Sequence, residues 1–432
     1  MVALVDDLDD MLAAAVGAAH ARRQTPTAAG FAHERGHPAT WVVRPGAPAE
    51  VAEVVRAAAR AGAAVVPLGT GSRRRTAPLP VGRPRVLLEL GRLAHVAHLD
   101  ETSLLVHAQA GLTGIALENL LVPRGLTLGD FPPAALRSSL GGLLAVRTPG
   151  KSSPRHGSLE DAVLGLSAVL ADGRTIHTRV APRRATGPDL ARAFLGTEGT
   201  LGVITQVVLR LRRRPEARLF DAHRFASVDH AVVALAAAFH KEARPAAARV
   251  YDADETRAHF GDGLAHADCA LLVVATAGPR ELAALDRTLI ADAARAAGAD
   301  PLGAAPAELW WRRRSGHALP DAPPVQPALV LFAPWARLGA VHRAARSAAR
   351  AAGRTARAHL SRFDDEGACV FITLLDGERA DPAGPARAAV LASTRAAGGL
   401  PPGEREPALA PALAALKRAL DPDDLLNPGV LP

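Results

Sequence analysis

The stretch LTLGDFPPAALRSSLGGLLAVRTPGKSSPRHGSLEDAVLG, residues 126–165, carries two adjacent glycines, Gly141 and Gly142, among apolar residues. It lies between two other glycine-containing segments, PLGTGSR at 67–73 and LGTEGTLGVIT at 195–205. The three segments follow one another in this order along the chain. This ordered trio decides our prediction of the fold.

The first of these segments has a physical meaning of its own. It follows the apolar run AAVVPLG (63–69), which predicts a strand, and its glycines would free backbone N–H groups to form a nest for a pyrophosphate. It matches neither a Walker P-loop nor a dinucleotide-binding fingerprint. Taken alone, it is better explained as a plain turn.

The elements around this segment predict a small β-α-β unit. The stretch from Pro48 to Gly62 has Val51, Val54 and Val55 at helical spacing and ends on glycine, which is typical of a helix. The predicted strands of the unit are WVVRP (41–45), AAVVPLG (63–69) and RVLLEL (85–90). Further strands are predicted at 103–111, 162–173, 174–180 and 202–215.

The second half of the chain predicts another α+β domain. We place the boundary near Arg212–Pro215, where strand alternation stops and long Ala-rich helical segments begin. The predicted helices are 228–242, 279–298 and 336–353, and they alternate with predicted strands at 270–276, 328–334 and 368–375. The Pro/Ala/Gly-rich stretches 315–327 and 398–411 predict surface loops.

The composition limits the function classes. The 432 residues are 49% hydrophobic and 22% charged, which is globular and long enough for two or three domains. All but three of the 51 basic residues are arginines, which is typical of a GC-rich coding bias, and no basic patch is interleaved with aromatic residues. We therefore expect no nucleic-acid partner.

Cysteine spacing and the N-terminus indicate the compartment. Cys269 and Cys369 lie far apart with no metal-type spacing, so we expect neither a disulfide framework nor a metal site. The N-terminus is acidic where a secretory signal would be basic, and no apolar run reaches the roughly 18 residues of a membrane span. We expect a soluble, cytoplasmic protein with no integral membrane segment.

Together, the three segments resemble the vanillyl-alcohol-oxidase-type (PCMH-type) FAD-binding domain over about residues 37–214. The resemblance implies that the first loop cradles the FAD pyrophosphate, that the paired glycines let the backbone approach the cofactor, and that Glu198–Ile204 lines it. The implied cofactor-binding residues are Pro67, Gly69, Thr70, Gly71, Ser72, Arg73, Asp130, Ser139, Gly141, Gly142, Arg147, Thr148, Glu198, Gly199, Thr200, Gly202, Val203 and Ile204. No histidine or cysteine occupies the loop position that some relatives use for covalent attachment, so we expect non-covalent FAD.

Further segments resemble the bacterial relatives of alkyldihydroxyacetonephosphate synthase, although glycolate-oxidase-type dehydrogenases share much of the pattern. These segments are ATGPDL (185–190), RVYD (249–252), WARL (335–338) and the tail from Asp421 to Gly429. The implied architecture is α+β: an N-terminal helical lead-in (1–36), a two-subdomain PCMH-type FAD-binding domain (37–214), an α+β cap or substrate domain (215–418) and a C-terminal tail returning to the FAD domain (419–432). The substrate site should lie between the two domains.

The sequence departs from the family in the first loop. Thr70 stands where a central glycine is usual, and threonine costs backbone freedom if its φ is positive. Arg73 stands where a final serine is usual. Arg73, Arg74 and Arg75 could compensate by pairing with phosphate oxygens, and a solvated basic loop explains them equally well.

A second group of departures concerns acid/base chemistry. Phe371 stands where the synthases carry a tyrosine for proton transfer, and Arg362 where they carry a histidine. Gly398–Gly403 has no histidine in place of their histidine-rich loop, and Ala318–Asp321 replaces a Tyr-Leu-Arg-Asp element. These losses argue against the synthase reaction, because they remove the groups that would take a substrate proton.

Two arginines remain as catalytic candidates: Arg249, at the family's substrate-contacting position, and Arg147, in the segment that runs over the flavin. Either could bind a phosphate or carboxylate bidentately, and a structural role is equally open for each. His156 replaces a tyrosine that normally packs near the cofactor domain, which favours a structural role. His317, His342 and His359 have no partner visible in the sequence and are interpreted as packed or surface histidines.

These observations predict an FAD-dependent oxidoreductase that acts on a small hydroxylated, anionic substrate by hydride transfer to the flavin. One alternative is an alkyldihydroxyacetonephosphate-synthase-like transferase. Another is a catalytically degenerate relative that keeps the FAD fold as a binding or scaffold protein. The expected partner is a small molecule, and a homodimer is left open.

Overall fold

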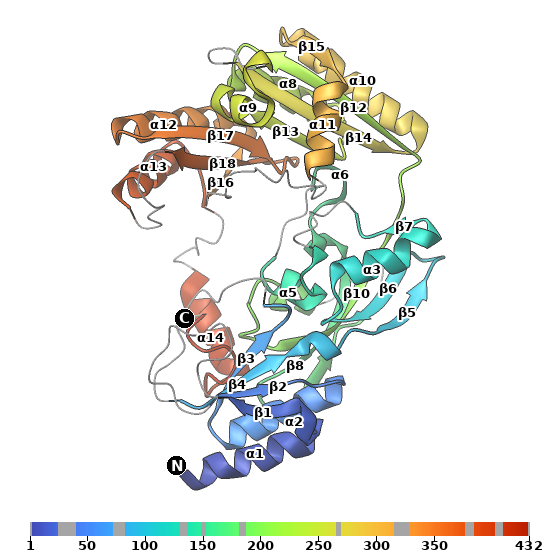
Figure 1. Cartoon of the computed structure of the whole chain (residues 1–432), viewed down its shortest axis with the longest axis vertical. Coiled ribbons are helices and arrows are strands. Elements are labelled where there is room, and N and C mark those ends of the chain that lie inside the picture. Colours follow the sequence, from blue (N-terminus) through green and yellow to red (C-terminus); the bar gives the residue numbers. More distant parts are fainter. Residues whose placement is uncertain are drawn as a thin grey trace.

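The computed structural model describes residues 2–24, 40–71, 83–129, 136–147, 153–180, 187–264, 269–314, 328–375, 384–401 and 409–430. Figure 1 shows two parts. The part with the N-terminus holds the two sheets of the first half of the chain, and the other part holds one large sheet with helices. The last helix, α14 (Ala410–Leu420), runs back to the first part (Figure 1).

The first sheet contains the predicted β-α-β unit. Its strand order is β1 (Ala21–Gln24), β2 (Thr40–Val43), β4 (Arg85–Glu89), β3 (Ala64–Leu68), with β2 and β3 both parallel to β4. Helix α2 (Pro48–Arg60) connects β2 to β3 and buries Val51, Val54 and Val55 under α1 (Val2–Val16) and the sheet. The edge strand β1 was missed, because its sequence ARRQ lacks apolar alternation.

The second sheet is antiparallel throughout, in the order β5 (Val96–Asp100), β6 (Leu105–Gln109), β10 (Val203–Arg210), β8 (Val163–Val169), β9 (Thr175–His177). One face packs against α3 (Gly114–Leu121), α5 (Leu140–Ala145) and α7 (Leu190–Phe194) in a single core. Strand β5 escaped prediction because its residues are half-buried or exposed. The short strands β7 (Leu126–Thr127) and β11 (Arg212–Arg213) pair beside this sheet.

The third sheet has seven strands, and all neighbouring pairs are antiparallel. The order is β15 (Asp300–Gly303), β12 (Ala217–Phe225), β14 (Ala270–Gly278), β13 (Ala247–Tyr251), β17 (Thr355–Ser361), β18 (Gly367–Leu375), β16 (Leu329–Pro334). Helices α8 (Val228–His240), α10 (Arg280–Ala296), α12 (Leu338–Ala351) and α13 (Pro385–Ala396) share a core with one face. Helices α9 (Ala253–Phe260) and α11 (Ala305–Arg314) pack on the other.

The structure differs from the predicted domain boundary in one respect. Strand alternation does not stop at Arg212–Pro215, because β12 begins at Ala217 and lies inside the large sheet. The polar residues Asp221 and His223 are buried in β12 and hide its pattern in the sequence. Charged side chains at alternate positions hide β13 and β17 in the same way.

The C-terminal helix also differs from prediction. The sequence placed 398–411 in a loop and 215–418 in the cap, but α14 begins at Ala410 and packs on the first half of the chain through Lys417 and Leu420. The proline and alanine residues that suggested a loop form the first turn of this helix. Within the described ranges, no helix is both long and apolar enough to cross a membrane.

Candidate flavin and substrate site

The first loop and the glycine pair meet at the end of β3. A Cβ added to Gly69 would lie 2.1 Å from Ser139 Oγ and 3.9 Å from the Cα of Gly142. Ser139 caps α5, since its Oγ accepts a hydrogen bond from the backbone N–H of Gly142 at 3.3 Å. Only a glycine at position 69 permits this approach, so two of the three sequence segments are adjacent in space.

The loop has the backbone of an anion site. Gly71 adopts a left-handed conformation with φ 66°, whereas Thr70 does not, so threonine at position 70 costs no backbone strain. Both residues are exposed, and in the described part of the chain their backbone N–H groups donate to no acceptor. Exposed N–H groups in a glycine turn suit a phosphate. The predicted residues Ser72, Arg73, Asp130 and Thr148, with Arg74 and Arg75, lie outside the described residues.

The two paired glycines differ from each other. Gly141 donates its N–H to the Ala110 carbonyl at 2.8 Å, and a Cβ there would lie 2.9 Å from the Ala110 Cβ. Packing within the protein therefore requires Gly141, which corrects the expectation that both glycines serve the cofactor. Gly142 is half-buried, and a Cβ there would meet only the Ser139 hydroxyl, at 3.0 Å. Of the pair, only Gly142 has open space beside it.

The third segment packs on the first. A Cβ on Gly199, which has φ 80°, would lie 3.0 Å from Pro67 Cγ. The preceding residue, Glu198, has φ 53°, and its carbonyl accepts a hydrogen bond from Asn427 Nδ2 at 2.6 Å. Asn427 itself has φ 42° and donates its N–H to the Val65 carbonyl at 2.7 Å. Such left-handed residues cost about 1–3 kcal/mol each and cluster at functional sites, as they do here.

A buried ion pair holds the tail beneath this segment. Lys417 is 5% exposed, and its Nζ donates to Asp421 Oδ2 at 2.5 Å, to the Leu426 carbonyl at 2.9 Å and to the Thr200 carbonyl at 3.1 Å. Asp421 also accepts the N–H groups of Leu425 and Leu426. Sequence reasoning missed this clamp. The available signal was that Lys417 is one of only three lysines in an arginine-dominated chain.

Arg147 has a partner inside the protein. Its Nε and Nη2 donate to the two carboxylate oxygens of Glu160 at 2.8 and 3.0 Å, and this hydrogen bonding raises the pKa of the guanidinium. Its backbone has φ 48°, and its side chain lies over Gly196, where a Cβ would come within 2.6 Å of it. These contacts suit a residue that positions the chain between 145 and 160. A catalytic role for Arg147 stays a prediction.

Arg249 lies on the face of the large sheet that is turned away from α8, α10, α12 and α13. Its neighbour Val250 points into the core shared with those helices, so Arg249 and Tyr251 point the other way. Arg249 Nη1 donates to the Tyr251 hydroxyl at 3.2 Å. The Nε of Arg249 is buried and has no hydrogen-bond partner among the described residues.

His359 and Phe371 share this face. They are register partners on β17 and β18, and their rings stack with centroids 4.7 Å apart. His359 Nδ1 lies 3.2 Å from Glu255 Oε1 on α9. Burial, and next the charge of Arg249, lower the pKa of His359 to about 4. The sequence showed no partner for this histidine, because Glu255 lies on an element distant in the chain.

The remaining histidines behave as packed residues. His342 Nε2 lies 3.4 Å from Asp252 Oδ2. Burial, followed by the charges of Arg212 and Arg155, lowers the pKa of His156 to about 4. His317 lies outside the described residues.

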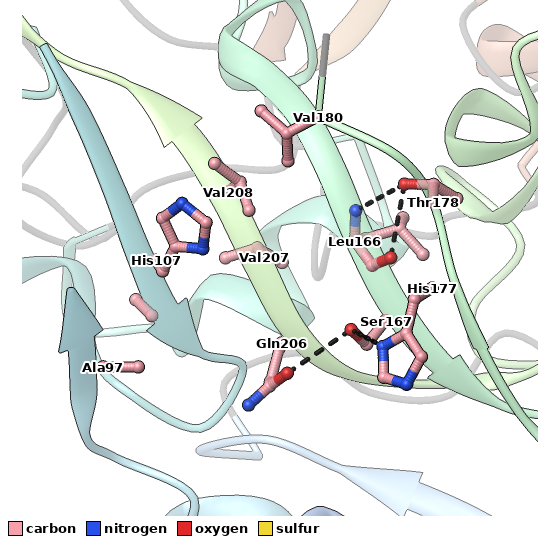
Figure 2. A pocket seen from close by; sticks show the side chains of 11 residues that line it. Ala97, His107, Leu166, Ser167, His177, Thr178, Val180, Gln206, Val207 and Val208 are labelled. Carbon is pink, nitrogen blue, oxygen red and sulfur yellow. Dashed lines mark hydrogen bonds between the residues drawn. The ribbon is translucent and has the colours of Figure 1, made fainter. Parts of the chain in front are cut away.

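A separate pocket of about 250 Å³ lies on the five-stranded sheet (Figure 2). Its polar side chains are His107, Ser167, His177 and Gln206, with Ser167 Oγ 2.8 Å from His177 Nδ1. These side chains alternate with the residues that face α3 and α5, so they lie on the opposite face of the sheet. This pocket is therefore not where the flavin motifs meet.

The convergence of three glycine segments beneath a second α+β domain defines a flavoprotein of the two-domain type. Residues 39–179 match the FAD binding domain family, and residues 214–404 and 401–431 match the C-terminal domain of FAD linked oxidases, which spans half of the chain. The chain belongs to the FAD-linked oxidases, which confirms the predicted family and enzyme class.

Individual proteins agree with this family. The chain is 34% identical over 196 residues to the uncharacterized FAD-linked oxidoreductase YgcU of Escherichia coli strain K12, a match that covers 45% of this chain and 40% of that relative. The chain thus spans less than half the length of this relative.

Solved structures bear on the fold. An alkyldihydroxyacetonephosphate synthase superposes with a TM-score of 0.75 at 24% identity, over 90% of this chain and 76% of that one. A p-cresol methylhydroxylase with substrate bound superposes with a TM-score of 0.73 at 15% identity, over 99% and 97%. At these identities the likeness shows the fold alone, and it confirms the predicted PCMH-type architecture.

Proposed function

We propose that this chain binds one FAD non-covalently and oxidises a small hydroxylated substrate that carries a carboxylate or phosphate. The observation that carries the proposal is the buried Nε of Arg249, which has no partner in the described part of the chain. An unsatisfied buried donor costs about 1–3 kcal/mol, so an anionic ligand that accepts from it would stabilise the site. Arg362 lies nearby with its guanidinium over Phe371, 4.9 Å from the ring centroid.

The residues around the first loop fit FAD. The N–H groups of Thr70 and Gly71 are exposed and without acceptors in the described ranges, as the pyrophosphate requires. Gly142 has open space beside it, and Gly199 brings the third segment against Pro67. Bound FAD would supply the electron acceptor for a hydride leaving the substrate carbon. The lack of a histidine or cysteine at the family's attachment position supports non-covalent binding.

Oxidation is favoured over the synthase reaction by the side chain at position 371. Phe371 has no hydroxyl to move a proton, and its ring is stacked on His359. The synthase alternative rests on the resemblance and on the fold of a solved synthase. Synthase turnover of acyl-dihydroxyacetone phosphate with a fatty alcohol at a rate typical of that family would support the alternative against our proposal. The cytoplasmic location and the homodimer stay predictions from the sequence.

The proposal is tested by the colour and the reduction of the purified protein. We expect one FAD per chain, released on denaturation, and anaerobic loss of the flavin absorbance with one of a panel of hydroxy anions: D-lactate, L-lactate, glycolate and glycerol 3-phosphate. A colourless protein that takes up no added FAD would support the scaffold alternative. A yellow protein that no hydroxy anion reduces would contradict the proposed reaction alone.

Arg249→Ala is expected to weaken anion binding at least tenfold, because a charge-assisted hydrogen bond contributes about 1.5–3 kcal/mol. FAD content and melting temperature should stay nearly unchanged, since Arg249 makes no ion pair among the described residues. Arg249→Lys should restore only part of the affinity, because lysine lacks the planar fork. The measurement is titration of the flavin absorbance with inorganic phosphate and with the reducing hydroxy anion.

Two results would contradict this assignment of Arg249. If Arg249→Ala unfolds the protein, the residue is structural. If it changes neither affinity nor stability, the anion binds elsewhere. The matched control is Arg343→Ala, because Arg343 is an exposed arginine of the same domain that pairs with Asp229 on the helix-covered side.

A further inference from the structure

The stacked pair of His359 and Phe371 lies beside the two arginines of the proposed anion site. His359 stands opposite Tyr251 on β13 and opposite Phe371 on β18 in the strand register. Cross-strand partners on one face lie side by side, which explains the close ring contact. Arg249 belongs to the same face, two residues before Tyr251, and its charge acts on His359. The imidazole thus lies where the proposed anionic substrate would be held.

Glu255 determines which nitrogen of His359 is basic. The carboxylate is 4% exposed and can only accept, so the Nδ1 that lies 3.2 Å from it carries the proton. Nε2 is then the basic atom of the neutral ring. No residue in the described part of the chain forms a hydrogen bond with Nε2, and the side chain keeps 15% of its surface exposed. A carboxylate behind one nitrogen and an open second nitrogen is the arrangement of an oriented base.

Glu255 is itself held ionised. Burial raises its pKa, but hydrogen bonds from His259 and His359 and the charges of both histidines outweigh burial and hold the pKa well below its usual range. The carboxylate also pairs with Arg357 at 2.8 Å. It therefore remains a fixed negative charge behind His359 over the whole neutral range.

We propose that His359 accepts the hydroxyl proton of the substrate at Nε2, with Glu255 as its positioning residue; this assignment rests on the proposed function. In this step the substrate O–H bond breaks and its proton moves to Nε2, while the C–H bond breaks and its electron pair leaves as a hydride to the bound flavin. The alcohol becomes a carbonyl, and the flavin is reduced by two electrons. The proton acceptor that Phe371 cannot provide is supplied by the ring stacked on it.

The charges around His359 tie proton acceptance to substrate binding. The charged or titratable groups near it are Arg249 and Tyr251 on β13, Glu255 and His259 on α9, Arg357 on β17, Arg362 after β17, and Cys369 on β18. Burial and Arg249 disfavour the imidazolium in the ligand-free protein. An anion held by Arg249 offsets that positive charge, so binding raises the pKa of His359 and makes the ring a better acceptor.

The first test needs no turnover. In ¹⁵N NMR of the FAD-loaded protein at pH 7, His359, assigned by its loss in His359→Gln, should be neutral and protonated on Nδ1. Added inorganic phosphate should raise its pKa, and Arg249→Ala should remove that rise. Protonation on Nε2, or a pKa that phosphate does not move, would overturn the proposal.

The second test follows anaerobic flavin reduction by the hydroxy anion that reduces the wild-type protein. His359→Gln should slow reduction by about 10²–10⁴-fold, the range of general base catalysis, with FAD content, melting temperature and phosphate affinity unchanged. Glu255→Gln should slow reduction less and shift the acid limb of the pH profile. His342→Gln is the matched control, because His342 is also a buried histidine beside a carboxylate but lies on the helix-covered side, and reduction should be unaffected.

The outcomes separate the two proposals. A wild-type rate of flavin reduction in His359→Gln overturns the assignment of the base and leaves the proposed function standing. A yellow wild-type protein that no member of the panel reduces overturns both.

Discussion

Gly142→Trp is expected to abolish FAD retention while the protein stays folded. Gly142 is the half-buried glycine whose added Cβ would meet only the Ser139 hydroxyl, and its Cα lies beside Gly69 of the first loop. An indole at this position would occupy the space above the loop that we assign to the cofactor. We expect less than a tenth of the wild-type ratio of flavin to protein absorbance after gel filtration, with circular dichroism unchanged.

The control for this variant is Gly91→Trp. Gly91 lies in the same half of the chain, is exposed and has no heavy atom near its added Cβ, so this variant should keep its FAD. Gly141→Trp is not a fair test, because its side chain would collide with Ala110 and disturb the fold first. Stoichiometric FAD in Gly142→Trp would mean that the cofactor does not lie over this loop.

Lys417→Met is expected to destabilise the FAD-binding half by about 3–5 kcal/mol, because it leaves the buried carboxylate of Asp421 without its cation. The same change frees the carbonyls of Thr200 and Leu426, so the third glycine segment and the tail should loosen together. The measurement is urea unfolding at neutral pH, followed by the fluorescence of released flavin. We expect the midpoint to fall and flavin release to begin at lower urea.

Lys241→Met is the matched control, since Lys241 is exposed at the end of α8 and makes no ion pair within the described ranges. Its effect should stay within about 0.5 kcal/mol. The double variant Lys417→Met with Asp421→Asn should recover part of the loss, because no unpaired charge remains buried. A wild-type urea midpoint in Lys417→Met would show that the clamp contributes nothing to stability.

The proposed base illustrates why a sequence hides some site residues. His359 has no partner within its own strand, and its three partners are Glu255 on α9, Tyr251 on β13 and Phe371 on β18. The strand register of a mixed α+β domain brings them together, and no local spacing predicts that register. Arg249 shows the complementary case: its position matched a family pattern, but its unpartnered Nε is visible only in three dimensions.

By itself, the sequence determined the flavoprotein class, because that signal is local. A strand followed by Gly69 and Gly71, a glycine pair behind a capping serine, and the run from Glu198 to Ile204 each depend on short-range backbone geometry. Only the tertiary structure decided which groups face one another: Gly141 against Ala110, Lys417 against Thr200, and His359 against Glu255. These contacts join elements far apart in the chain, and their energies depend on burial and distance, which arise only when the sheets and helices pack.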